Sequence, residues 1–215
     1  MARIDSLRTL LIEQLRDLYD AEKRLTKAIP KLMKESSSDE LTSALETHLG
    51  ETENQVSRLE RAFQALGETA KGKECKGIKG IIEEGDEHVG EDFADDGLKD
   101  ATIIGAAQRV EHYEIAGYGT AIAHARLLGQ DEVVQLLEET LDEEKAADEK
   151  LTELAEQIVN PDAASDEDEE ETDREMAGVA ASPGSKSASS GKRGPTGRSS
   201  SGNRRSTRRR SGRSR

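Results

Sequence analysis

The sequence predicts an all-α protein, a four-helix bundle built from two antiparallel helical hairpins, and three observations lead to that fold class. Aromatic residues are scarce, with two Phe, three Tyr and no Trp among 215 residues, so the core must consist of Leu, Ile, Val and Ala, which favours helices. Apolar residues recur three and four positions apart along four long segments, which is the period of an amphipathic helix. A single long connection separates the second of these segments from the third.

The first hairpin is predicted over residues 6–67. Residues 6–33 place Leu at helical spacing on one face, and Pro30 is expected to kink or end this helix. Ser37 is followed three residues later by Glu40, which is the pattern of a capping box. The second helix is therefore expected to start at Ser37 and to continue to Gly67.

The second hairpin is predicted beyond the long connection. Asp100 is a suitable N-cap for the third helix, whose apolar face runs as far as Gly129. Gly129, Gln130 and Asp131 form a short connection between the third and fourth helices. The fourth helix is expected to stop at Pro161.

The crossover between the hairpins, residues 68–99, contains the stretch IIEEGDEHVGEDF, which predicts a short extra helix. One long crossover between two hairpins is typical of ferritin-like bundles, whereas up-down-up-down bundles have only short loops. The bundle is predicted to cover residues 1–160. Residues 161–215 have almost no apolar side chains, which predicts a disordered tail, acidic over 162–175 and rich in Arg, Ser and Gly over 176–215.

Charge is distributed unevenly along the chain, although the formal net charge is −14. Residues 176–215 carry eleven Lys and Arg and no acidic residue. This basic segment is expected either to contact the phosphates of a nucleic acid or to serve as a solvated spacer. The excess of acid in the rest of the chain fits an ordinary acidic bundle and equally a protein of a high-salt cytoplasm.

Cysteine content and hydropathy exclude several classes of protein. Cys75 is the single cysteine, so neither an internal disulfide nor a cysteine-based metal site is expected. The N-terminal residues lack the apolar run of a signal peptide, and no stretch is long and apolar enough to cross a membrane. We therefore expect a cytoplasmic protein that has no membrane partner.

Polar residues interrupt the apolar stripe of every predicted helix near its middle. In order along the chain they are Glu22, His48, Glu51, Glu111, Glu114, Glu144 and Asp148. Counted from the two hairpin loops, Glu22 lies nearly level with Glu51, and Glu114 lies nearly level with Glu144. Any one of these glutamates taken alone would be interpreted as a boundary residue that reaches solvent. Their coincidence at one level of the bundle indicates a common site instead.

A cluster of buried carboxylates points to metal binding. Ionised carboxylates that are close together and out of water repel one another, and most would be protonated unless a cation were present. Inward-facing Glu and His side chains are the ligands of di-metal bundles, so all seven residues are candidate metal ligands. Tyr19, Tyr113 and Tyr118 lie within about a turn of them, where a phenol packs in the core, hydrogen-bonds a carboxylate or takes part in electron transfer.

Four segments of the chain resemble a known family. LRDLYDAEKRLTKAIPKL, HLGETENQVSRLE, DATIIGAAQRVEHYEIAGYGTAIAHA and LLEETLDEEKAADEKL are similar to the signature segments of the YciE/YciF ferritin-like family, over about residues 5–158. The resemblance implies a ferritin-like fold, a stress-associated role, a ferroxidase-like site and a homodimer.

The resemblance also implies roles for individual residues. Glu22 resembles the ligand of the first helix, His48 and Glu51 a His-x-x-Glu pair, Glu111 and Glu114 a Glu-x-x-Glu pair, and Glu144 the ligand of the last helix. Relative to the better-known di-iron pattern, His precedes Glu in the second helix, and Ala147 stands where a second His would be, which leaves Asp148 as a substitute. The site is poorer in nitrogen for both reasons. We expect two metal ions, with iron preferred and manganese or zinc as alternatives.

Three hypotheses of function follow from the sequence. The first is a di-iron protein of ferroxidase type that acts against oxidative stress by oxidising ferrous ions with oxygen or peroxide. The second is a non-enzymatic metal-binding bundle with a structural role under stress. The third is a nucleic-acid-associated protein that acts through its basic tail.

Overall fold

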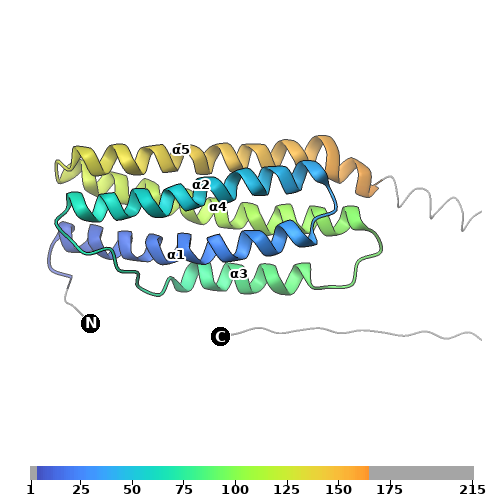
Figure 1. The fold of residues 1–215 in the computed structure, drawn as a ribbon, viewed down its shortest axis with the longest axis horizontal. Coiled ribbons are helices and arrows are strands. Elements are labelled where there is room, and N and C mark those ends of the chain that lie inside the picture. Colours follow the sequence, from blue (N-terminus) through green and yellow to red (C-terminus); the bar gives the residue numbers. More distant parts are fainter. Residues whose placement is uncertain (1–3, 165–215) are drawn as a thin grey trace, which may run out of the picture.

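A computed structural model describes residues 4–164, and it contains helices but no strand over that range. The helices are α1 Leu7–Glu35, α2 Asp39–Ala65, α3 Lys76–Val89, α4 Asp96–Leu127 and α5 Asp131–Leu154, followed by a π-helical turn, Ala155–Val159. The prediction of an all-α, ferritin-like bundle is confirmed, including the short helix in the crossover (Figure 1). The tail predicted beyond residue 164 lies outside the described residues.

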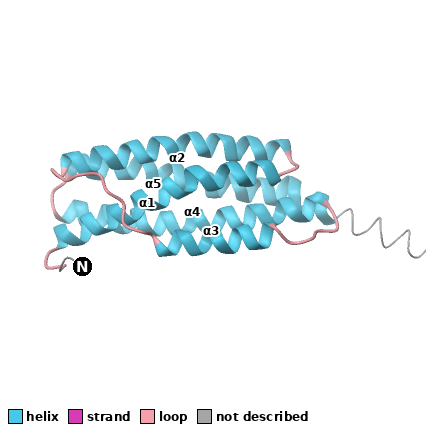
Figure 2. Cartoon of the chain, turned by 60° about the horizontal axis from the view of Figure 1, so that its bottom comes forward, coloured by secondary structure: helices cyan, strands magenta, loops and turns pink. Residues whose placement is uncertain are grey.

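The four long helices form a ring in which α1 contacts α2 and α4, and α5 contacts the same two helices. Hairpins α1–α2 and α4–α5 thus lie side by side and enclose a common core. Helix α3 packs on the outside of the ring, against α1 and α4, and Figures 1 and 2 show it beside these helices rather than among the central four. The crossover therefore covers one face of the bundle.

Helix boundaries differ from the predicted ones at four positions. Pro30, which the sequence predicts to kink or end the first helix, does not end it, because it lies inside α1, which continues to Glu35. A proline in a helix loses one backbone hydrogen bond, but the buried side chains of Leu25 and Ile29 hold this part of α1 in the core. At the other end of the chain, helical structure continues through Pro161 to residue 164 by way of the π-helical turn.

Asp100 is the third correction. The N-cap of α4 is Asp95, whose carboxylate accepts a hydrogen bond from the backbone N–H of Leu98, whereas Asp100 is buried one turn into the helix. Its carboxylate accepts from Ser37 N, Ser37 Oγ and Ser38 N at 2.7–3.0 Å, so it caps the loop between α1 and α2 from the opposite hairpin. The N-cap of α2 is accordingly Ser38 rather than Ser37.

Helix α3 is anchored at its first turn. The Sγ atom of Cys75, its N-cap residue, lies 3.1 Å from Asp17 Oδ2 in α1 and 3.1 Å from Tyr113 Oη in α4. A Cβ atom on Gly77 would lie 2.4 Å from the Tyr113 ring, so only glycine allows α3 to cross α4 this closely. Three helices therefore meet at Cys75, and the outer helix is held in a defined position.

The core consists of two apolar clusters with a polar layer between them. One cluster includes Leu15, Leu18 and Leu137, and the other includes Leu25, Ile104 and Leu151. Along each central helix, the predicted polar residues fall between members of the two clusters. The apolar clusters fix the positions of the helices, and the layer between them holds the site.

Candidate metal centre

All four helices of the ring contribute to the polar layer. Glu22 comes from α1, His48 from α2, Glu111 and Glu114 from α4, and Glu144 from α5. Each of these residues is buried, with at most 7% of its surface exposed. Glu111 and Glu114 are three residues apart on one helix, and the burial of both places them on its inward face. Five of the seven predicted site residues are thus brought together.

The five side chains form two groups. One consists of His48, Glu111 and Glu144, the other of Glu22, Glu114 and Glu144, and in each group one ligand atom from every residue lies within 4.8 Å of the others. Both groups include Glu144, so its carboxylate lies between two positions that a cation could take. This arrangement matches a pair of ions with a bridging carboxylate.

Several ligand atoms of the cluster lack a hydrogen-bond partner in the part of the chain that the structure describes. Among the described residues, the buried atoms that lack a hydrogen bond include Glu22 Oε2, His48 Nε2, Glu111 Oε2 and both carboxylate oxygens of Glu114 and of Glu144. Buried polar atoms are almost always hydrogen-bonded, so seven such atoms in one layer need a physical reason. Coordination of metal ions would supply it, since oxygen atoms with one imidazole nitrogen suit iron or manganese.

In the absence of a metal ion, the electrostatics of the site disfavours ionisation of its carboxyl groups. Burial raises the pKa of Glu22, Glu111 and Glu114 well above the ordinary value of a carboxyl, and neighbouring carboxylates raise it further. The pKa of Glu144 is also raised, again mainly by burial. When ionised, the four carboxylates carry the charge that two divalent cations would neutralise. The charge balance therefore fits two ions better than one.

Glu51 lies outside both groups, at the side of His48. Its Oε2 is 3.4 Å from His48 Nδ1, and its side chain is 34% exposed. With the proton on Nδ1, the imidazole donates to Glu51 and directs the lone pair of Nε2 towards Glu111 Oε1, 3.3 Å away, and Glu144 Oε2, 3.8 Å away. A carboxylate that orients a histidine in this way is common at metal sites. Glu51 thus lies outside both groups, in a position from which it can orient His48.

Asp148 also lies outside both groups. Its carboxylate accepts a hydrogen bond from Gln108 Nε2 at 3.1 Å and lies 3.4 Å from His112 Nε2 on the exposed side of α4. Its charge nevertheless contributes to the raised pKa of Glu111. Asp148 is therefore a neighbour of the cluster, although the sequence placed it among the candidate ligands.

Tyr118 is the tyrosine that reaches the cluster. Its hydroxyl, fully buried, donates a hydrogen bond to Glu22 Oε1, which leaves Glu22 Oε2 directed into the site. Burial raises the pKa of Tyr118 well above its ordinary value, with the charges of Glu22 and Glu114 adding to the effect. All three tyrosines hydrogen-bond a carboxylate, but Tyr19 donates to Glu60 and Tyr113 to Asp17, whereas Tyr118 donates to a residue of the cluster.

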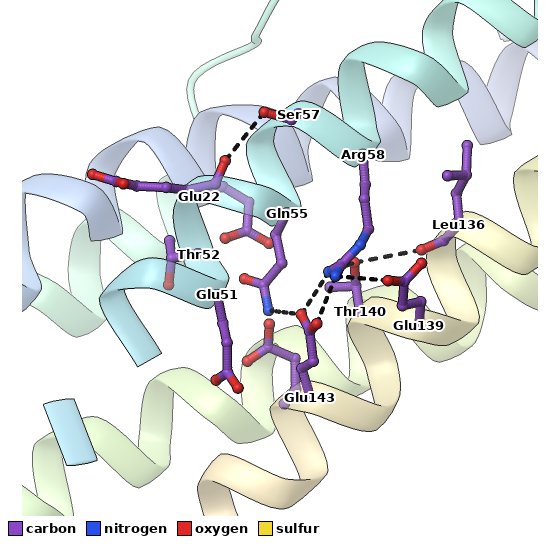
Figure 3. A network of polar contacts seen from close by, with 12 residues as sticks. Glu22, Glu51, Thr52, Gln55, Ser57, Arg58, Leu136, Glu139, Thr140 and Glu143 are labelled. Atoms are coloured by element: carbon purple, nitrogen blue, oxygen red, sulfur yellow. Dashed lines mark hydrogen bonds and ion pairs between the residues drawn. The ribbon is translucent and has the colours of Figure 1, made fainter. Parts of the chain in front are cut away.

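Sequence reasoning missed an ion-pair network next to the cluster, which Figure 3 shows in full. Arg58 of α2 donates to both oxygens of Glu143 of α5, at 2.5 Å and 2.6 Å, and also to Glu139 at 2.9 Å. Gln55 donates to the same Glu143 at 3.1 Å. Because Glu143 precedes Glu144, this clamp fixes the register of α5 against α2 at the level of the site.

A groove connects the cluster with the surface. It lies between α2 and α5, has a volume of about 640 Å³, and includes both His48 and Glu111 in its lining. Its outer part carries Asp39, Glu40 and Glu51 against a single Lys150. Ala147, which stands where a second histidine was considered, is another lining residue. A hydrated cation therefore has an acidic route to the His48 side of the cluster.

Fold and site together define a ferritin-like bundle with a buried carboxylate and imidazole cluster suited to metal ions. Residues 6–164 match the family DUF892, described as a domain of unknown function. Protein YciF of Escherichia coli strain K12 is 42% identical over 159 residues, which are 74% of this chain and 95% of that protein. The chain belongs to the DUF892 family, as the resemblance to YciF-like proteins predicted.

Solved structures agree with this assignment. The crystal structure of the E. coli stress protein YciF matches with a TM-score of 0.69 and 42% identity, covering 73% of this chain and 99% of the other. YcfI of Rhodopseudomonas palustris, described as a candidate structural protein, matches with a TM-score of 0.69 and 46% identity. The match covers 71% of this chain and 97% of YcfI. None of the helices in residues 4–164 is long and apolar enough to cross a membrane.

Proposed function

We propose that this chain is a di-metal protein of ferroxidase type, which binds two ferrous ions in the central layer and oxidises them with dioxygen or peroxide. The observation that supports this proposal most directly is the set of seven buried ligand atoms without a hydrogen-bond partner. They belong to residues that form two groups with Glu144 in common. In the reaction each Fe(II) gives up one electron to become Fe(III). Two such electrons, with two protons from water, reduce dioxygen to hydrogen peroxide.

The ligand residues are assigned to the two proposed metal positions by the group to which each belongs. Glu111 and His48 would hold one ion, Glu22 and Glu114 would hold the other, and Glu144 would be a ligand common to both groups. Ferrous ions replace the protons that burial keeps on these carboxyls, so binding releases protons to water. Bound iron supplies the electrons, while the protein supplies fixed oxygen ligands that favour the ferric product.

The surroundings keep these ligands in place. Tyr118 orients Glu22, Glu51 orients His48, and the Arg58–Glu143 pair fixes α5 beside α2. The two apolar clusters on either side of the layer exclude bulk water, which strengthens the electrostatic attraction between the ions and the carboxylates.

The alternative function is a structural bundle in which a bound ion only joins the helices. One observation favours it: the related YcfI is described as a candidate structural protein. In that case the ions would bind at the same residues, but no oxidation faster than in buffer would follow.

Anaerobic loading with Fe(II), followed by oxygen, distinguishes the two functions. The rate of Fe(III) formation, measured by absorbance, should exceed the rate in buffer for the wild type. It should fall to the buffer rate for Glu144→Gln, which loses the shared ligand. Glu149→Gln is the matched control, because Glu149 is an exposed residue of the same helix, and it should behave as the wild type. Oxidation at the buffer rate by wild-type protein that has bound iron would favour the structural alternative.

A further inference from the structure

A second cavity reaches the cluster from the side opposite to the groove. Its volume is about 40 Å³, and it lies beneath α3, with further lining residues from α1, α2 and α4. Apart from His48, Glu111 and Asp86, every residue of its lining is aliphatic or glycine. His48 and Glu111 are buried, whereas Asp86 is exposed, so the cavity extends from the surface beside α3 to the His48 side of the cluster.

The lining decides which molecules this cavity can hold. Roughly 10–15 Å³ of such volume is enough for one water molecule, but a water also needs two to four polar partners, and apolar cavities stay dry. Along most of its length this cavity offers only side chains such as Leu25, Ile29, Ile82 and Val110. Hydrated cations are excluded from it for the same reason. A small apolar molecule has room and loses no hydrogen bonds on entering.

We propose that this cavity is the route by which dioxygen reaches the centre, separate from the acidic groove that admits cations. The proposal rests on the proposed function, because it needs a centre that consumes dioxygen. Both routes end at the same residues, His48 and Glu111, but only the groove carries several acidic side chains along its lining. Helix α3 then does more than connect the hairpins, because its residues Ile81, Ile82 and Gly85 form the outer wall of the passage.

The first test uses xenon and needs neither iron nor activity. Xenon is an apolar probe that enters dry cavities of protein crystals. Crystals of the metal-free wild type under xenon pressure should show an atom between α3 and α4, lined by Ala107 and Val110. The variant Ala107→Val, whose added methyl groups point into the cavity, should show none. Absence of xenon there in the wild type would overturn the proposal.

The second test separates the two oxidants in stopped-flow measurements on protein loaded with Fe(II). Ala107→Val in α4 and Ala28→Val in α1 narrow the passage from two sides, so a folding defect in one leaves the other as a test. Each should lower the second-order rate constant for dioxygen several-fold at unchanged iron stoichiometry. The rate with hydrogen peroxide, which is polar and enters by the groove, should stay the same.

Ala101→Val is the matched control, because Ala101 packs against the same apolar cluster from α4 but does not line the cavity. It should oxidise iron at the wild-type rate with both oxidants. If the filled variants react with dioxygen as fast as Ala101→Val, dioxygen does not use this passage. If the wild type oxidises no iron at all, the proposed function fails, and the xenon experiment alone reports whether the dry passage exists.

Discussion

Replacing Arg58 by Ala should destabilise the bundle more than the loss of any exposed charge would. The side chain of Arg58 is 10% exposed and that of Glu143 is 23% exposed. The guanidinium of Arg58 donates hydrogen bonds to both carboxylate oxygens of Glu143. Removing one partner of a buried pair costs about 3–5 kcal/mol, because the other charge is left unpaired. Glu143 keeps some contact with solvent and Glu139 is largely exposed, so the lower end applies, and we expect a loss of about 3 kcal/mol.

Urea denaturation of the metal-free protein, followed by circular dichroism, measures this loss. For a folded unit of this size, about 3 kcal/mol corresponds to a melting temperature lower by roughly 6–12 °C. Glu143→Gln in the Arg58→Ala background should recover part of the stability, since it removes the unpaired charge. Arg61→Ala, an exposed arginine of the same helix, is the control and should change stability by less than about 0.5 kcal/mol. An equally small effect of Arg58→Ala would refute this reasoning.

Four further predictions concern the site and the tail. Glu114→Gln should reduce the iron bound in anaerobic titration from two ions to one, because the His48 group keeps its ligands. Glu51→Ala should weaken binding by about tenfold or more without changing the stoichiometry, whereas a lost ion would make Glu51 a ligand. Burial raises the pKa of Glu22, Glu111 and Glu114 above that of the unfolded chain, so the folded metal-free protein binds more protons than the unfolded chain does. Its melting temperature should therefore decrease as the pH is raised from about 5 to about 8, and bound metal should reverse this trend. A chain ending at residue 164 should keep its helicity and metal but lose any retention on nucleic acid at low salt, whereas equal retention would exclude the tail as the contact.

The fold could be predicted because its signal is repeated over long segments. Among the four helices of more than twenty residues, α1, α2 and α5 present a regular apolar face, and the single long crossover selects the topology. The errors arose where one residue carries a strong local preference that packing overrides. Pro30 and Pro161 are both accommodated in helical structure, and Asp100 caps a loop of the other hairpin, which no local pattern reveals.

The candidate site could be predicted in part, because antiparallel helices of equal rise bring residues at equal distances from a loop to one level. That reasoning gives the level but only an approximate direction for each side chain. Glu51 follows His48 by three residues and is rotated towards the groove, so it misses the centre by part of a turn. The sequence alone would predict Arg58 to be an exposed charge, because its partner Glu143 lies 85 residues further along the chain.

The central claim is that the polar layer binds two ions on either side of Glu144. Crystals grown with manganese or with iron under anaerobic conditions, and measured at the absorption edge of the metal, locate the ions by anomalous scattering. We predict two peaks within the bundle, one among His48, Glu111 and Glu144 and one among Glu22, Glu114 and Glu144. A metal-loaded crystal with no peak in this layer, or with its only peaks at surface carboxylates, would contradict the account.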